Sequence, residues 1–300
     1  MSTPAAPAPA PAPATAECQL IQGRPIAQRI QADLKTEIEQ LRAQNVALKL
    51  VAVMVGENAG STVYVNQQRK LADSMGIAYE LMQLPGTSTE ADVIQVVERL
   101  NADPAVTGVI LQQPMPQQIA IRNIIEKLNP AKDAEGMHPN SLGHVLMGDA
   151  HVAPCTASAV MEILAAQGMN LYGKEVVIVG HSDIVGKPLT LMMLNKFGTT
   201  TTCHIATSQA HKLQDHLATA EVVVVAVGVA RLIKGEWLRP GTVLIDVGIN
   251  KVGDQIVGDA DFESCKLKCA AITPVPGGVG PLTNTMLMKN LVALARAAHH

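Results

Sequence analysis

The fold is indicated most clearly by the run Glu175-Val-Val-Ile-Val179 and by the segment that follows it, Gly180-His-Ser-Asp-Ile-Val-Gly-Lys-Pro188. An apolar β-branched run that ends in glycine and opens into a helical segment is typical of an α/β sheet. The turn of such a unit presents backbone N–H groups to a pyrophosphate. The Gly180–Gly186 spacing is not the usual G-x-G-x-x-G, and ordinary turns also carry two glycines. Plain turn chemistry therefore stays an alternative to dinucleotide binding.

The sequence that follows favours the dinucleotide. Four more runs of β-branched or apolar residues continue the strand pattern at α/β spacing, and two of them end at Gly228 and Gly248. These runs are residues 199–203, 222–227, 243–247 and 270–275. Because the turn at Gly180 occurs together with these predicted strands, it is stronger evidence for dinucleotide binding than it would be alone.

The upstream half alternates in the same way. Apolar periodicity predicts helix 26–41, strand 48–56, helix 61–75, strand 79–85, helix 89–100 and strand 108–114, with a closing helix at 284–297. Alternating strands and helices predict parallel sheets. We therefore expect an α/β fold of two domains flanking a cleft, the second a Rossmann-like doubly wound parallel sheet. The expected limits are 1–17 for a disordered Ala/Pro tail, 18–157 plus 283–300 for the first domain and 158–282 for the second.

Composition argues against several classes of function. Hydrophobic residues make up 48% of the chain but aromatic ones only 2%, so the core must be aliphatic and no stacking platform is available for nucleic acid. A formal charge of −3 and the absence of a dense Lys/Arg run argue against a nucleic-acid partner. No apolar stretch approaches membrane-span length. The tail lacks the pattern of a secretory signal. Five cysteines without CxxC spacing indicate reduced thiols in a cytoplasmic protein and no metal site.

A second glycine–proline run, Thr273-Pro-Val-Pro-Gly-Gly-Val-Gly-Pro-Leu-Thr283, lies near the C-terminus. Prolines fix φ, and glycines let the backbone approach a flat ligand closely. We expect this run to form a rigid loop of the site rather than a packed helix.

Together these features resemble the methylenetetrahydrofolate dehydrogenase/cyclohydrolase family, from about residue 26 to residue 294. Besides the two glycine–proline runs, the matching stretches are Tyr64-Val65, Arg69-Lys70, Gly76-Ile77, Gly108-Val-Ile-Leu-Gln112, Lys132-Asp133 with Gly136, Pro154-Cys-Thr156, Ile233-Lys-Gly-Glu-Trp237 and Ile245-Asp-Val-Gly-Ile-Asn250. The resemblance implies a folate-binding catalytic first domain and a nicotinamide-binding second domain. It implies hydride transfer from 5,10-methylenetetrahydrofolate to the nicotinamide, then addition of water to the methenyl product. It also suggests a homodimer.

The chain departs from the family at the catalytic lysine. That lysine lies four residues after the tyrosine matched by Tyr64, and here the position is Gln68, on the same helical face. An amide neither takes nor releases a proton near neutral pH, whereas hydride transfer needs mainly a held geometry and the cofactor. We therefore expect oxidation with weak or absent water addition. Lys70 is an alternative replacement, although helix geometry turns it about 200° away from Gln68.

The folate pocket differs as well. The family's Asp-Val-Asp-Gly appears as Asp133-Ala-Glu-Gly136, so the pterin-binding aspartate becomes Glu135. Its carboxylate can still accept two hydrogen bonds but reaches about 1.5 Å further. The substrate could therefore be an ordinary folate in a pocket of altered sequence, or an unusual pterin. Asp133 either binds the substrate or caps the turn. The residues expected in catalysis are Tyr64, Gln68, Gln112 and Glu135. The expected substrate contacts are Tyr64, Gln112, Asp133, Glu135, Pro276, Gly277 and Gly278.

The cofactor site lacks a fixed cation. Relatives that use NADP place an arginine and a serine where this chain has His181 and Ile205. A 2′-phosphate needs fixed donors, so we expect NAD rather than NADP. However, we find no acidic residue placed to bind the ribose of NAD. NADP stays an alternative, because its phosphate could induce protonation of His181. The expected cofactor contacts are Gly180, His181, Ser182, Ile184, Val185, Gly186, Ile205, Gly228, Gly248 and Ile249.

The sequence thus predicts an NAD-linked methylenetetrahydrofolate dehydrogenase with little cyclohydrolase activity. A bifunctional dehydrogenase/cyclohydrolase that tolerates Gln68 is the first alternative. A folate- or nucleotide-binding protein without chemistry is the second, and the retained Tyr64, Gln112 and cofactor turn argue against it.

Overall fold

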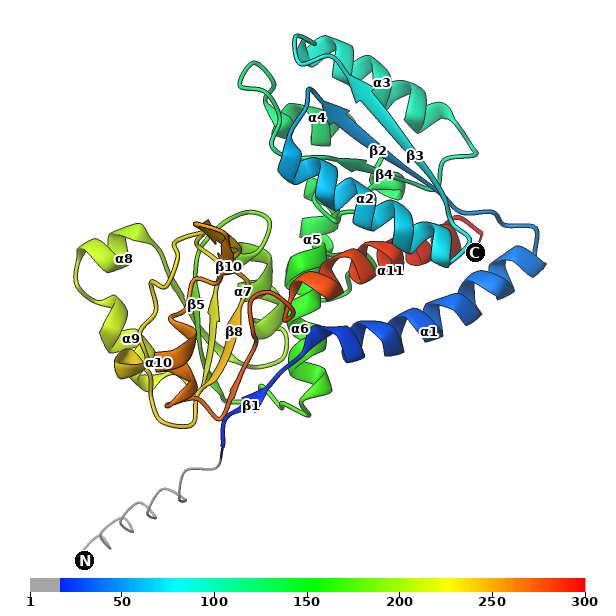
Figure 1. Cartoon of the computed structure of the whole chain (residues 1–300). Coiled ribbons are helices and arrows are strands. Elements are labelled where there is room, and N and C mark those ends of the chain that lie inside the picture. Colours follow the sequence, from blue (N-terminus) through cyan, green and yellow to red (C-terminus); the bar gives the residue numbers. More distant parts are fainter. Residues whose placement is uncertain (1–16, 300) are drawn as a thin grey trace, which may run out of the picture.

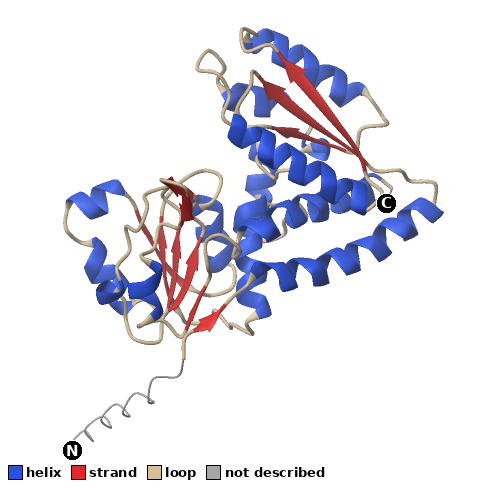
Figure 2. Ribbon diagram, viewed as in Figure 1, coloured by secondary structure: helices blue, strands red, loops and turns tan. Residues whose placement is uncertain are grey.

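The structure, a computed structural model, describes residues 17–299, so nearly all of the predicted tail lies outside the described residues. Two α/β units are present, each with its own sheet (Figures 1 and 2). Helices α6 and α11 lie between the two sheets, with α1 alongside α11 (Figure 1). Among the described residues, none of the helices combines the length and apolar character that a membrane span requires.

The first unit contains a parallel three-stranded sheet in the order β3-β2-β4. Residues 50–53 of the central strand are fully buried. Val51 and Val53 face the cluster built from α3 and α4, whereas Leu50 and Ala52 face the cluster that includes α1 and α11. Burial on both faces explains why this strand is continuously apolar rather than alternating. The elements of this unit are α1 Gly23–Ala43, β2 Lys49–Val55, α2 Ala59–Ser74, β3 Ala78–Leu84, α3 Glu90–Ala102, β4 Gly108–Leu111, α4 Ile121–Lys127, η1 Pro130–Lys132, α5 Pro139–Met147 and α11 Gly280–Ala298.

The second unit contains a parallel six-stranded sheet in the order β1-β11-β8-β7-β5-β6. From β5 the chain crosses to β6 on one side and then to β7 on the other. This reversal creates a switch point at the carboxyl ends of the strands, where α/β sheets bind ligands. The elements are β1 Gln19–Leu20, α6 Cys155–Ala166, β5 Glu175–Val179, α7 Gly186–Leu194, β6 Thr199–Cys203, α8 Ile205–Gln209, α9 Leu213–Thr219, β7 Val222–Val225, η2 Gly235–Trp237, β8 Val243–Asp246, β9 Asn250–Val252, β10 Gln255–Val257, α10 Phe262–Lys266 and β11 Ala271–Ile272.

The predicted alternation and the parallel sheets are confirmed, with element ends that differ by a few residues. Two expectations were wrong. Helix α11 begins at Gly280, so the last part of the second glycine–proline run is helical. Pro281 is tolerated there because first-turn N–H groups have no partner within the helix. Strand β1, placed in the first domain by sequence, pairs in parallel with β11 and belongs to the second sheet. Helices α4 and α5 and the antiparallel β9–β10 hairpin were not predicted.

Candidate active site

Gln68 lies at the centre of a buried polar cluster. Its side chain on α2 is only 8% exposed. Its Oε1 accepts hydrogen bonds from Gln112 Nε2 at 2.8 Å and from the Tyr79 hydroxyl at 3.1 Å. Gln112 directly follows β4, and its backbone N–H donates to Val53 O at 2.9 Å, which anchors it to the central strand. Gln68 and Gln112, predicted from separate motifs, are therefore in direct contact.

Tyr79 is a member of this cluster that the sequence did not identify. It lies on β3, and the Arg69 guanidinium carbon sits 5.7 Å from the centre of its ring. Burial, partly opposed by the charge of Arg69, raises the pKa of Tyr79 to about 12. The hydroxyl therefore stays protonated at neutral pH and donates its hydrogen bond to Gln68.

The two other residues singled out on α2 are more exposed. Tyr64 lies one turn before Gln68 and is 41% exposed, so its ring is free to cover a ligand. Lys70 is exposed while Gln68 is buried. The structure therefore gives no support to the alternative that Lys70 takes the place of the family's lysine.

Glu135 lies beside the same end of β4. Its Oε2 accepts a hydrogen bond from the Leu111 N–H at 3.2 Å, one residue before Gln112. Burial raises the pKa of Glu135 to about 8. The Leu111 hydrogen bond opposes this shift and the nearby Asp133 adds to it. This shift favours the protonated form of the carboxyl compared with an ordinary exposed glutamate.

Asp133 is buried and fully engaged within the chain. Its carboxylate accepts hydrogen bonds from the Gly136 N–H at 3.1 Å, the His138 N–H at 2.8 Å and the Ser141 hydroxyl at 2.7 Å. These bonds tie the loop after η1 to the start of α5. The geometry favours the turn-capping interpretation of Asp133 over direct substrate binding.

The loop of Pro276, Gly277 and Gly278 contacts α1. Gly277 has a φ of +113°, a conformation suited to glycine, and its carbonyl accepts a hydrogen bond from the Gly23 N–H at 2.9 Å. The following helix reaches α2, where Asn284 Nδ2 lies 3.5 Å from Gln67 Oε1. The loop is therefore held close to the helix that carries Gln68.

A cavity of about 430 Å³ opens at the switch point of the second sheet. Gly180 and Gly186 form a backbone cradle beside it. Gly180 has a φ of +127°, and a Cβ there would lie 2.3 Å from Ala226 O. A Cβ at Gly186 would lie 2.0 Å from Gly180 O. Only glycine fits at either position, so the turn suits the close backbone approach that a dinucleotide pyrophosphate requires. The lining residues are Val179, Gly180, His181, Ser182, His204, Ile205, Ser208, Leu213, Ala226, Val227, Val229 and Leu232.

Only part of the predicted cofactor set lines this cavity: Gly180, His181, Ser182 and Ile205. Ser182 Oγ accepts a hydrogen bond from the Val185 N–H at 3.1 Å and so stabilises the turn. The predicted contacts Gly228 and Gly248 have N–H groups that already donate to Asp259 and Asp246. Ile184 and Ile249 are exposed. The sequence missed His204, Ser208 and Val229, which follow β6 and β7 and were identifiable only from those strand ends.

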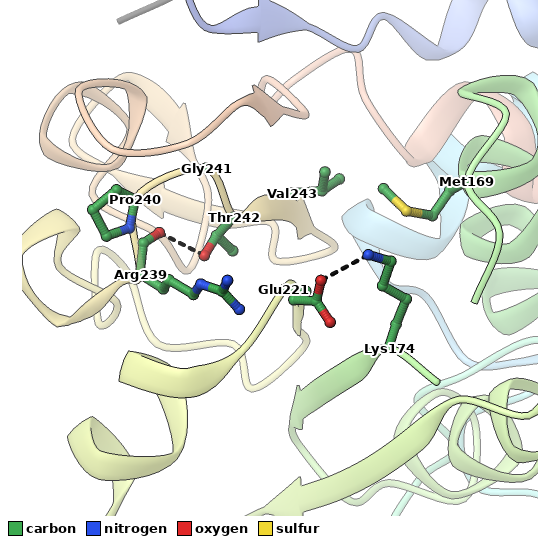
Figure 3. A pocket seen from close by; sticks show the side chains of 8 residues that line it. All are labelled: Met169, Lys174, Glu221, Arg239, Pro240, Gly241, Thr242 and Val243. Atoms are coloured by element: carbon green, nitrogen blue, oxygen red, sulfur yellow. Dashed lines mark hydrogen bonds and ion pairs between the residues drawn. The ribbon is translucent and has the colours of Figure 1, made fainter. Parts of the chain in front are cut away.

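A smaller pocket of about 140 Å³ lies at the opposite edge of the same sheet (Figure 3). Lys174 Nζ and Glu221 Oε1 form an ion pair of 2.7 Å in this pocket, beside Arg239. Lys174 and Glu221 precede β5 and β7, whereas ligands of such sheets bind at the carboxyl ends of the strands. We interpret this pair as structural. Within residues 17–299, no group of His, Cys, Asp or Glu side chains is arranged to hold a metal ion.

Comparison with known proteins agrees with this geometry. The catalytic-domain model of tetrahydrofolate dehydrogenase/cyclohydrolase matches residues 21–135, and the NAD(P)-binding-domain model of the same family matches residues 154–299. The chain belongs to the tetrahydrofolate dehydrogenase/cyclohydrolase family. The resemblance that the sequence motifs indicated is confirmed. The NAD(P)-binding-domain match contains the second sheet except β1 and extends over α11.

Relatives cover almost the whole chain. A protein of Geobacter metallireducens named bifunctional protein FolD 2 is 42% identical over 278 residues, which are 92% of this chain and 96% of that protein. The crystal structure of the bifunctional FolD enzyme of Campylobacter jejuni has a TM-score of 0.90 at 34% identity and covers 94% of this chain and 99% of its own. A Trypanosoma brucei FolD complexed with NADP and inhibitor also has a TM-score of 0.90 at 34% identity, with 95% and 100% covered.

Proposed function

We propose that this chain oxidises 5,10-methylenetetrahydrofolate to the methenyl cation. The observation that carries the proposal is the contact between Gln68 and Gln112 in a chain of this family that also has a glycine cradle for a dinucleotide. A nicotinamide bound beside the turn at Gly180 would supply the acceptor for the hydride of the methylene bridge. Tyr64 covers the folate, Gln112 orients it, and the turn at Gly180 holds the dinucleotide. These residues hold the two reactants close together and in the correct orientation, and this positioning can account for a large share of the rate enhancement.

We propose that the same site also adds water, but slowly. The names of the relatives favour a bifunctional enzyme over the predicted loss of water addition. In this step water adds to the methenyl carbon, one ring C–N bond breaks, and a proton is released as 10-formyltetrahydrofolate forms. A lysine can carry that proton, whereas the Gln68 amide cannot. A dehydrogenase with no water addition remains the second candidate, and the buried, uncharged Gln68 is the observation that favours it.

The proposed cofactor at neutral pH is NAD. His181 and Ile205 line the cavity where a 2′-phosphate would require fixed positive donors. No arginine or lysine lines this cavity in the described part of the chain. NADP is the second candidate, because the Trypanosoma brucei relative was crystallised with it.

Purified protein mixed with 5,10-methylenetetrahydrofolate and either NAD or NADP tests these proposals. We expect nucleotide reduction, faster with NAD, together with methenyl absorbance that decays slowly but faster than in buffer alone. Methenyl decay at the buffer rate would support the dehydrogenase without water addition. No reduction of either nucleotide would refute the oxidation itself.

We also propose a homodimer formed through the second domain. Tyr172 and Phe197, with ring centroids 5.6 Å apart, are 71% and 72% exposed beside the edge strand β6, and Leu194 is 54% exposed. Exposed apolar clusters of this kind mark protein interfaces. Analytical ultracentrifugation should show a dimer for the unaltered chain and a monomer for Tyr172→Glu. A monomeric unaltered chain would refute the proposal.

A further inference from the structure

Two histidines stand together in the wall of the cofactor cavity. His181 follows the first glycine of the turn after β5, and His204 follows the last residue of β6. Their ring centroids lie 5.2 Å apart and the rings are inclined by 53°. Both residues line the cavity, with Ser182 and Ser208 also in its wall. His181 is among the cofactor contacts predicted from the sequence, whereas His204 is not.

The end of β6 is where an α/β dinucleotide site discriminates between cofactors. A carboxylate at this place binds the ribose hydroxyls of NAD, and a fixed cation binds the 2′-phosphate of NADP. Among the described residues, the wall of this cavity contains neither a carboxylate nor a fixed cation. No Asp, Glu, Lys or Arg from the turn after β5, from β6 and α8, from the end of β7 or from α9 lines the cavity. The nearest charge along the turn, Asp183, is already paired with Lys187 and Arg122.

We propose that His181 and His204 form a protonation-dependent 2′-phosphate site that sets the choice between NAD and NADP. This inference rests on the proposed function, because it assigns cofactor specificity to the same cavity. When both rings are neutral, each offers a single N–H donor and no charge, so the cavity favours NAD. When they are protonated they present two positive charges to one phosphate.

Close spacing links the two protonations to the phosphate. Two imidazolium rings whose centroids are 5.2 Å apart repel each other electrostatically. A phosphate carrying about two negative charges removes that repulsion and forms charge-assisted hydrogen bonds with both rings. Binding of NADP is therefore accompanied by proton uptake, and binding of NAD is not.

The size of the effect follows from proton linkage. For one imidazole of ordinary pKa, about 6.5, that must be protonated for tight binding, affinity falls about 25-fold between pH 6 and pH 8. The phosphate becomes fully dianionic over the same range and recovers about twofold of this loss. If both rings take up a proton, the loss reaches a few hundredfold.

Isothermal titration calorimetry of the whole protein with NAD and with NADP, from about pH 6 to about pH 8, tests the inference. We expect the dissociation constant of NADP to rise at least tenfold relative to that of NAD. Titrations in buffers of different ionisation enthalpy should show proton uptake with NADP only. His204→Gln and His181→Gln should each reduce the slope, and His181→Arg should make NADP binding tight and independent of pH.

The matched control is His151→Gln, an exposed histidine outside the cavity, which should leave both slopes unchanged. An NADP-to-NAD affinity ratio that is flat with pH would overturn the inference, as would a slope that survives in the double variant of His181 and His204. If neither nucleotide binds at any pH, the cofactor assignment under the proposed function fails and this inference fails with it. Normal NAD binding with a flat ratio refutes this inference alone.

Discussion

Replacing Gln68 with lysine should accelerate water addition while leaving hydride transfer within a few-fold of its original rate. A positioned group that carries a proton contributes about 10²–10⁴-fold to such a step. This range equals about 2.7–5.5 kcal/mol of barrier. In this site the lysine must also enter a position that is 8% exposed, where burial lowers its pKa toward neutrality. We expect a gain near the lower end, about 10²-fold.

The structure also indicates what Gln68→Lys costs. The hydrogen bonds from Gln112 and Tyr79 to Gln68 Oε1 would be lost unless both donors reorient. At about 1 kcal/mol each, the variant should lose about 2 kcal/mol in free energy of unfolding. Chemical denaturation measures this loss and separates it from the kinetic gain.

The assay adds methenyltetrahydrofolate directly and follows its loss, so that water addition is observed without oxidation. Gln40→Lys makes the same chemical change on the exposed face of α1 and should leave the rate unaltered. Gln68→Met keeps the length without an amide and should not accelerate the step. If the folded Gln68→Lys variant consumes methenyltetrahydrofolate no faster than the unaltered protein does, residue 68 does not limit water addition. That result would refute the role assigned to Gln68.

Three further predictions concern other parts of the structure. Burial raises the folded-state pKa of Glu135 from 4.5 to about 8, so the free energy of unfolding should fall as pH rises between these values. The slope, at most about 1.4 kcal/mol per pH unit, should disappear in Glu135→Gln; a parallel pH profile of the two proteins would contradict this. Asp183→Asn breaks two exposed ion pairs, one with Arg122 of the first unit and one with Lys187 on α7, and should cost less than about 1 kcal/mol per pair by urea denaturation. Gly180→Ala puts a Cβ 2.3 Å from a backbone oxygen at a φ of +127° and should lose at least about 2 kcal/mol together with dinucleotide binding. Its control is Gly143→Ala on the exposed face of α5, where no atom lies within 4 Å; this change should be neutral or stabilise by up to about 1 kcal/mol.

The sequence predicted those elements whose signal is local. A few residues are enough to recognise the four consecutive valines of β7 and the glycine turn after β5. Both features are present in the structure. Strand β1 has only two residues, and its place in the second sheet depends on β11, some 250 residues later in the chain, so no local pattern reveals it.

The site shows the same division. Gln68 and Gln112 were found because each lies in a recognisable motif, but their 2.8 Å contact depends on the packing of α2 against the sheet. Tyr79 joins them only through the register of β3 with β2, which periodicity does not supply. The protonation of Glu135 depends on burial, which is a property of the folded chain. His204 was identifiable only after the end of β6 was known.

A crystal structure of this protein with a bound methenyltetrahydrofolate analogue would show directly what stands beside the reactive carbon. We expect the carboxamide of Gln68 to lie within hydrogen-bond distance of the one-carbon bridge, with no amine in contact with it. A Gln68 side chain turned to solvent, with the ammonium of Lys70 or another lysine against the bridge, would contradict it.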